Sequence, residues 1–258
     1  MSKAARERSA RERLAADRKR QQARSKQRRL LAIVLGTVVA VAVIVVGTVL
    51  IIDQQGKDGK AEPHTGALAP LTRQPDGSIV MAQAGVTKPE LEIFEDFQCP
   101  ICKQFEESTG KTVLELAQQG KVKVVYRPFH LFGQQRDPVK INSLRSAEAA
   151  LCVPADKWIS YHGALFKFQP REGDEGFSPD DLVQWGKDIG ITDANFEKCV
   201  RDEQKKPQVE AMTDYALKTR GVDGTPTLFI DGKKLTPEQF SNPGALRGTI
   251  DAAKAAGK

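Results

Sequence analysis

The sequence predicts an α/β domain whose small sheet is interrupted by an all-helical insertion, preceded by one N-terminal transmembrane helix. Three observations lead to this prediction. An uncharged, apolar run of 23 residues lies near the N-terminus of the 258-residue chain. Short runs rich in β-branched and aromatic residues lie on both sides of a long segment with helical periodicity. Two cysteines separated by two residues come directly after one of these runs.

The uncharged run covers residues 30–52 and is rich in Val, Ile, Leu and Ala. As a helix it would span roughly 35 Å, enough for a hydrocarbon core of about 30 Å. A cleavable signal peptide is the main alternative, but its apolar region is shorter and ends at a small-residue cleavage site. Here Asp53-Gln54-Gln55 follows the run. We therefore expect an uncleaved anchor in the lipid bilayer.

The basic residues of the chain are concentrated before this run. Residues 1–29 contain twelve Lys or Arg and three acidic residues, whereas the whole chain has a net charge of +6. By the positive-inside rule, residues 1–29 form a cytoplasmic arm and the rest of the chain is extracytoplasmic, in a single-pass protein of the cell membrane. The arm could also contact lipid headgroups or RNA, but a solvated tail that sets topology is the simpler interpretation. For the folded part, no nucleic-acid-binding surface is expected.

The first half of the exported part combines a spacer with two strands. Residues 53–77 are polar, contain Gly and Pro, and lack periodicity, so we expect an extracytoplasmic linker. Residues 78–82 could form a first short strand. Residues 91–97 are aromatic and β-branched and predict a strand, and a helix follows as far as about residue 119. Residues 122–129 predict a second strand.

Residues 142–220 predict the helical insertion. Gly190 and Gly221 end two of its helices. Apolar residues recur at three- and four-residue spacing in residues 144–153, 158–168, 182–189 and 200–217. After the insertion, residues 227–230 predict a third strand, and Asp231-Gly232 is typical of a hairpin turn. Helical segments near residues 237 and 246–256 close the domain.

The cysteine pair, Cys99-Pro100-Ile101-Cys102, lies where a strand passes into a helix. The first sulfur is then at the helix N-terminus, where unpaired backbone N–H groups and the helix dipole favour a thiolate. Pro100 suits the first helical turn because it has no N–H to leave unbonded. The second sulfur lies one turn further along and more deeply buried. We therefore expect Cys99 to attack and Cys102 to resolve the mixed disulfide in thiol–disulfide exchange.

Two other interpretations of the pair are weaker. A zinc site would need two further Cys or His at close spacing, and Cys152, Cys199 and the three histidines are isolated in the sequence. A structural disulfide between residues so close together at a helix start would be strained and easily reduced. Neither interpretation explains the pair as well as redox chemistry does.

A second motif lies more than 120 residues later, at residues 224–232 (Gly-Thr-Pro-Thr-Leu-Phe-Ile-Asp-Gly). A Thr-Pro just before a strand can use a cis peptide bond to place an exposed backbone edge beside the redox sulfurs. With both motifs the sequence resembles the thioredoxin superfamily, specifically its DsbA-like branch. Residues 97–102 (Phe-Gln-Cys-Pro-Ile-Cys) look like that active site, and residues 149–152 and 161–166 are similar to the helical lid of membrane-anchored Gram-positive members. The resemblance covers about residues 78–256.

This resemblance implies a thioredoxin fold with a helical insertion, and an enzyme that oxidises cysteines of unfolded exported proteins. Thr225 and Pro226 would contact the substrate backbone, with Pro226 cis. A membrane reoxidase, DsbB or a vitamin K epoxide reductase-like protein, would restore the disulfide. No metal and no bound organic cofactor is implied, and we expect a monomer.

Two positions depart from the family pattern. Ile101 stands where the best-studied oxidases have His, so one group that stabilises the thiolate is absent. Ile93, six residues before the first cysteine, occupies the position of a buried acid. Glu95 and Asp96 lie close by, but strand alternation alone does not show whether either reaches Cys102. The direction of the exchange and the proton relay are therefore not determined by the sequence.

The other two cysteines, Cys152 and Cys199, both fall in the helical insertion. An even pair in an oxidising compartment predicts a structural disulfide, which by the chain-entropy model would contribute roughly 4 kcal/mol. Two buried thiols or a second redox pair are the alternatives. His130 and His162 are expected to be packing or surface residues.

Other functions of the same fold are also open. A disulfide reductase or isomerase is the nearest alternative. A non-catalytic docking module is a third possibility, against which the intact cysteine pair argues.

Overall fold

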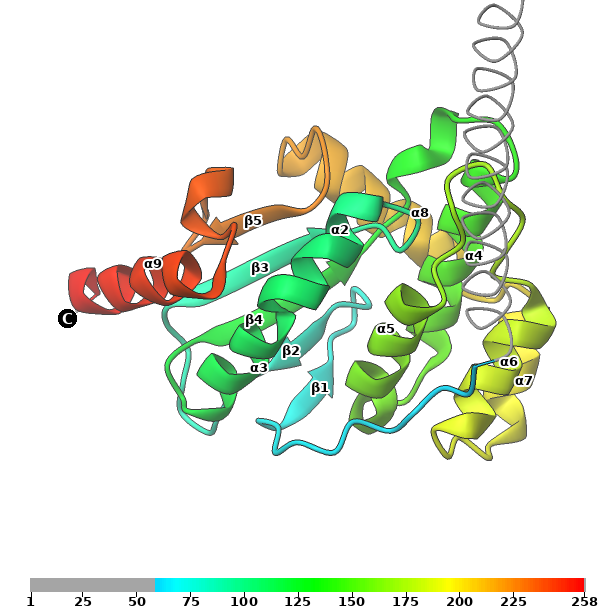
Figure 1. The fold of residues 1–258 in the computed structure, drawn as a ribbon, viewed down its shortest axis with the longest axis horizontal. Coiled ribbons are helices and arrows are strands. Elements are labelled where there is room, and N and C mark those ends of the chain that lie inside the picture. The colour runs from blue at the N-terminus through cyan, green and yellow to red at the C-terminus, as the bar shows by residue number, and fades with distance from the viewer. Residues whose placement is uncertain (1–58, 258) are drawn as a thin grey trace, which may run out of the picture. The chain divides into compact units, whose positions relative to one another are not determined.

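The computed structural model describes residues 59–257 (Figure 1). The expected basic arm, the expected transmembrane helix and the first residues of the expected linker lie outside these described residues. Within residues 59–257, no helix is both long enough and apolar enough to cross a membrane.

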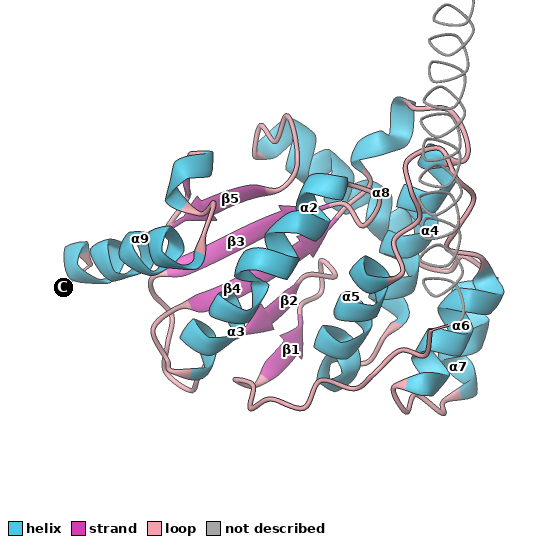
Figure 2. Ribbon diagram, viewed as in Figure 1, coloured by secondary structure: helices cyan, strands magenta, loops and turns pink. Residues whose placement is uncertain are grey.

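A six-stranded sheet with the order β1-β2-β4-β3-β5-β6 is the centre of the domain (Figure 2). Strands β3 and β4 pair in parallel, and every other pair is antiparallel. The strands are β1 (Leu71–Arg73), β2 (Ile79–Met81), β3 (Glu90–Glu95), β4 (Lys123–Pro128), β5 (Thr227–Ile230) and β6 (Lys233–Lys234). The three runs that the sequence analysis assigns to strands thus form the middle of the sheet, where β-branched and aromatic residues are buried on both faces.

Helices cover both faces of this sheet. Ile93 of β3 faces a large core shared with α2 (Pro100–Phe105), α3 (Lys111–Gln118) and α9 (Pro243–Ala256). A π-helical turn, Glu106–Gly110, joins α2 to α3. Phe94, the next residue of β3, faces a smaller cluster that contains Met212 of α8 (Lys206–Asp214). Because neighbouring side chains of a strand point to opposite faces, Ile93 and Phe94 pack in different hydrophobic cores on the two sides of the sheet.

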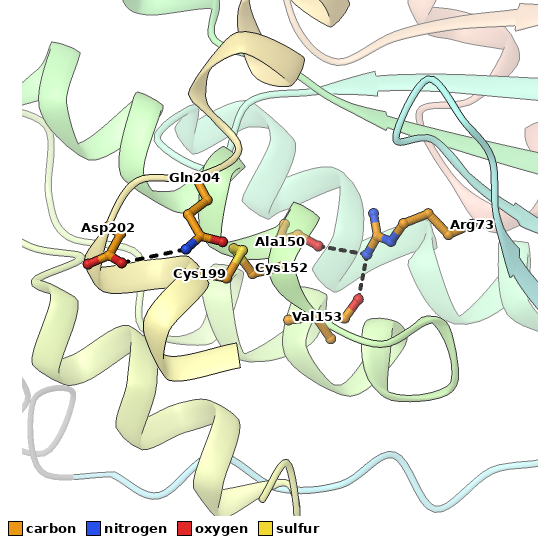
Figure 3. The surroundings of a disulfide bond; sticks show 7 residues. All are labelled: Arg73, Ala150, Cys152, Val153, Cys199, Asp202 and Gln204. Carbon is orange, nitrogen blue, oxygen red and sulfur yellow. Dashed lines mark hydrogen bonds between the residues drawn. A yellow bond between two sulfur atoms is a disulfide. The ribbon is translucent and has the colours of Figure 1, made fainter. Parts of the chain in front are cut away.

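The helical insertion follows β4. Its helices are α4 (Val139–Cys152), α5 (Trp158–Lys167), α6 (Pro179–Asp188), α7 (Ala194–Arg201) and α8, which continues into the π-helical turn Tyr215–Thr219. A disulfide joins Cys152 at the end of α4 to Cys199 in α7, with the two Cα atoms 5.8 Å apart, the pairing expected from the sequence (Figure 3). Near this bond the Arg73 guanidinium donates to the carbonyl oxygens of Ala150 and Val153, at 3.0 and 2.6 Å (Figure 3). The end of α4 is thus tied to α7 and to the edge strand β1.

Residues 59–77 differ from the expected spacer. Ala61 and Ala69 are buried, and the Ala61 N–H donates to the Asp188 carboxylate at 3.1 Å. The segment then enters the sheet as β1. Its polar composition does not reveal this, because none of the three side chains of this edge strand is fully buried and the strand is held by backbone pairing with β2.

Candidate active site

The cysteine pair lies where the sequence analysis expects it, after the end of β3 and at the start of α2. Cys99 is the N-cap residue of α2 and Pro100 is its first residue. The Cys99 side chain is 6% exposed, whereas Cys102 is fully buried. Both are free thiols in this structure. Cys99 is therefore slightly exposed to solvent and Cys102 is not.

The two thiols have opposite pKa shifts. A hydrogen bond from the Cys102 thiol, helped by backbone N–H groups at the helix start, lowers the pKa of Cys99 from 9.0 to about 6, although burial acts in the opposite direction. Burial raises the pKa of Cys102 well above its ordinary value, and the negative charges of Cys99 and Glu95 add to the increase. At neutral pH, Cys99 is thus largely a thiolate and Cys102 a thiol, as expected for an attacking and a resolving cysteine.

The second sequence motif meets the first in space. The Thr225–Pro226 peptide bond is cis, and it lies just before β5. The Cys99 sulfur is 3.4 Å from the Thr225 carbonyl oxygen, although 126 residues separate them in sequence. Because β5 pairs with β3, the sheet itself holds this loop beside the start of α2.

Asp96 fixes the turn that leads to the cysteines. Its carboxylate accepts hydrogen bonds from the Ser143 hydroxyl at 2.5 Å and from the backbone N–H groups of Leu131 and Gln98, at 2.8 and 2.9 Å. Burial nevertheless raises its pKa to about 6. These bonds join the active-site turn to α4 and to the segment after β4, so Asp96 has a positioning role.

Glu95 is the acid that faces the buried cysteine. It is 2% exposed, and burial raises its pKa from 4.5 to about 8. Its Oε2 atom lies 3.0 Å from Nε2 of His162, which is also buried, and burial lowers the pKa of that imidazole. Glu95 therefore carries a proton at neutral pH. When it ionises, its negative charge raises the pKa of the Cys102 thiol, so the two groups are near each other. His162, which the sequence favours as a packing or surface residue, has a polar partner in the interior.

Gln169 is a further residue of the site, and the sequence around it carries no signal of such a role. This residue follows α5, and its side-chain amide donates to the carbonyl oxygens of Phe97 and Cys99 at 2.6 and 2.9 Å. The loop after α5 thereby holds the active-site turn from the insertion side. No local sequence pattern distinguishes such a glutamine, because its partners are backbone atoms 70 and 72 residues away.

Ile101 places an apolar surface beside the reactive sulfur. Its side chain is 58% exposed, and among residues 59–257 the only other exposed large hydrophobic side chain is Leu217. A large apolar side chain that remains in solvent beside a reactive group is suited to contact with an apolar segment of another chain.

Comparisons with known proteins agree with this geometry. The chain matches the thioredoxin family model over residues 84–252. Among solved structures, it resembles reduced DsbA from Mycobacterium tuberculosis at 26% identity and a TM-score of 0.53, over 69% of this chain and 94% of that one. The disulfide bond oxidoreductase DsbG of the same organism gives 26% identity and a TM-score of 0.57, over 77% of this chain and 91% of that one.

A third structure, the thiol-disulfide oxidoreductase MdbA from Corynebacterium diphtheriae, has the same fold. Its identity is 22% and its TM-score 0.57, over 77% of this chain and 98% of that one. No curated protein sequence gives a significant match. The matched structures agree with the DsbA-like oxidoreductase class that the sequence predicts.

Proposed function

The chain belongs to the thioredoxin family, and we propose that it is a membrane-anchored, extracytoplasmic oxidoreductase that introduces disulfides into exported proteins. One observation carries the proposal. A cysteine with a pKa of about 6 lies at a helix N-terminus, 3.4 Å from the carbonyl oxygen that precedes a cis-proline. A second cysteine, protonated and buried, lies one helical turn below it.

The oxidised protein would react through Cys99. A substrate thiolate attacks the Cys99 sulfur, a new sulfur–sulfur bond forms, and the Cys99–Cys102 bond breaks. Cys102 receives the electron pair and, because its pKa is high, takes up a proton. Glu95, which holds a proton up to about pH 8, is the group placed to supply it.

The second half of the reaction releases the product. Another thiolate of the substrate attacks the substrate sulfur in the mixed disulfide, and Cys99 leaves as a thiolate. Its pKa of about 6 makes Cys99 a good leaving group at neutral pH. The protein has then gained two electrons and the substrate has gained a disulfide. Thr225 and Pro226 present the backbone edge along which the substrate would lie during both steps.

The low pKa of Cys99 favours oxidation of substrates over their reduction. Lowering this pKa from 9.0 to about 6 stabilises the reduced folded protein by about 1.4 kcal/mol at pH 7, or about 30 mV for a two-electron couple. The contribution is complete above pH 9 and is lost as the pH falls through 6. A stabilised reduced form accepts electrons from substrates more readily.

The proposed location depends on the sequence outside the described residues. The uncharged run 30–52 would anchor the protein in the bilayer, with the basic arm in the cytoplasm and the redox domain outside. There a membrane reoxidase, of the DsbB or vitamin K epoxide reductase-like kind, would take the two electrons. We propose that the protein acts as a monomer.

Trapping of mixed disulfides tests the exchange reaction. With Cys102→Ser, the full chain expressed in a host that exports it should accumulate covalent adducts between Cys99 and exported proteins, visible on a non-reducing gel and removed by reductant. The Cys99→Ser, Cys102→Ser double variant is the matched control and should form none. Absence of adducts with the single variant would favour the docking-module alternative.

The direction of exchange needs a separate measurement. Equilibration of the Cys99–Cys102 couple with glutathione gives its reduction potential. We expect a value closer to the oxidant range of about −120 mV than to the thioredoxin range of about −270 mV. A value in the lower range would indicate a reductase instead.

A further inference from the structure

Three side chains that could bind a metal ion lie together behind the active site. They are Glu95 at the end of β3, Glu106 in the π-helical turn after α2, and His162 in α5. Each offers a ligand atom, and these atoms all lie within 4.8 Å of one another. Glu95 and His162 are buried, whereas Glu106 is partly exposed. These three residues are far apart in the sequence, and the tertiary fold brings them together.

The hydrogen bonding of this cluster is incomplete. Oε1 of Glu95 and Oε1 of Glu106 are both buried, and no hydroxyl, amide or backbone N–H group among the described residues donates to them; the two carboxyl groups interact with each other. Within residues 59–257, no lysine or arginine forms an ion pair with either carboxylate. A buried carboxylate without a cationic partner is costly, so each must either keep a proton or bind a cation.

A cavity connects the cluster with the surface. Its volume is about 570 Å³, and Glu106 and His162 form part of its wall together with Tyr126 and Phe166. Two lysines, Lys111 and Lys167, also line it, but their ammonium groups lie 3.9 Å from Glu115 and 3.6 Å from Glu62. An ion therefore has a path to the site, and neither lysine supplies the missing positive charge.

The backbone around Glu106 has an unusual conformation that makes room for its side chain. A π-helical turn is rare and is often found at functional sites. Gly110, the last residue of that turn, leaves room for the Glu106 side chain, because a Cβ at this position would collide with its carboxylate. The carboxylate can thus lie over the helix and toward His162.

We propose that Glu95, Glu106 and His162 form a three-ligand site for a divalent transition-metal ion, Zn²⁺ in the first instance. Two carboxylates and one imidazole are ligands that zinc accepts, at about 2.0–2.2 Å, and the cavity leaves a fourth position open to water. The imidazole disfavours Ca²⁺ and Mg²⁺, which prefer oxygen ligands alone. The glutamate side chains would move inward slightly to reach these distances. The site uses no cysteine and is separate from the zinc site that the sequence analysis rejects for Cys99 and Cys102.

Binding of Zn²⁺ alone to the full chain tests the proposal. The protein is used in its oxidised state, with Cys99 and Cys102 in a disulfide, so that free thiols do not compete for the metal. After treatment with a chelator, calorimetric titration should show one Zn²⁺ per chain, and Zn²⁺ should raise the Tm. Because no substrate thiol is present, no disulfide exchange takes place, and the result does not depend on the proposed function.

Two variants and one control decide whether the metal is at this site. Glu106→Gln and His162→Gln should each weaken binding at least tenfold and abolish the increase in Tm. Glu107→Gln changes a carboxylate that lines the same cavity but is exposed, and it should bind as the wild type does. Absence of stoichiometric binding by the wild type would overturn the proposal. So would wild-type affinity in Glu106→Gln, which replaces a partly exposed carboxyl group by an amide of the same shape and should fold even if His162→Gln does not.

Discussion

The hydrogen bond from the Cys102 thiol is the largest cause of the low pKa of Cys99, and this gives a sharp test of the site. Cys102→Ala removes the donor, whereas Cys102→Ser keeps a hydroxyl at almost the same place. Both variants lack the second sulfur, so neither can form the active-site disulfide. They differ in one hydrogen bond to Cys99.

The size of the expected effect follows from this bond. A hydrogen bond to a charged group contributes about 1.5–3 kcal/mol, and a change of about 1.4 kcal/mol moves a pKa by one pH unit. In Cys102→Ala the pKa of Cys99 should therefore increase from about 6 to between about 7 and 8. At pH 7 the thiolate fraction would fall from about nine tenths to between about one half and one tenth.

The pH dependence of Cys99 alkylation by iodoacetamide measures this fraction, because only the thiolate reacts. The ultraviolet absorbance of the thiolate provides a second measurement. Cys102→Ser should titrate near the wild-type value and Cys102→Ala clearly above it. If the two variants titrate together, the helix N-terminus alone sets the pKa and the role assigned to the Cys102 thiol is wrong.

Three further predictions concern the groups around the cysteines. Burial raises the pKa of Glu95 from 4.5 to about 8, so the stability that its neutral form contributes is complete below pH 4.5 and is lost as the pH rises through 8. Glu95→Gln should therefore equal the wild type in Tm at acid pH and exceed it above pH 8; a constant difference would contradict this. Replacing both Cys152 and Cys199 by Ser should lower the free energy of unfolding by about 2–4 kcal/mol in urea titrations without changing the alkylation profile of the active site. Gln169→Ala removes two hydrogen bonds to active-site carbonyls and should cost about 1–3 kcal/mol and alter the reduction potential, whereas Gln204→Ala, at an exposed position, should change neither.

The central strands and the redox motif could be predicted because their signals are local. The apolar run of β3 leads directly into Cys99, and the Thr225-Pro226 pair marks the start of β5. Each signal occupies fewer than ten residues and depends on backbone preferences that hold in any context. The meeting of the two motifs followed only from the family resemblance, since nothing in either segment specifies its partner.

Residues whose role depends on distant partners could not be found in this way. Gln169 acts on carbonyls about 70 residues away, and Arg73 ties an edge strand to the end of α4. Both are polar residues in segments without periodicity, which is how solvent-exposed loops also look. Only the folded backbone shows which carbonyl oxygens lie within their reach.

The buried acid Glu95 could be predicted from the sequence only in part. Ile93 occupies the position where the family resemblance implies a carboxyl group, and Glu95 follows it by two residues on the same strand. Because side chains two apart in a strand point to the same face, alternation predicts that Glu95 shares the face of Ile93, and Ile93 packs in the core that contains Cys102. The carboxylate has thus moved about 7 Å along the strand, toward the cysteines, without changing sides. Alternation cannot predict the partner of Glu95, because Nε2 of His162, 3.0 Å from the Glu95 carboxylate, belongs to a residue 67 positions later in the chain. The local sequence therefore determines toward which face of the sheet the Glu95 side chain points. Its pKa, and its ability to transfer a proton or bind a metal ion, depend on residues of the helical insertion.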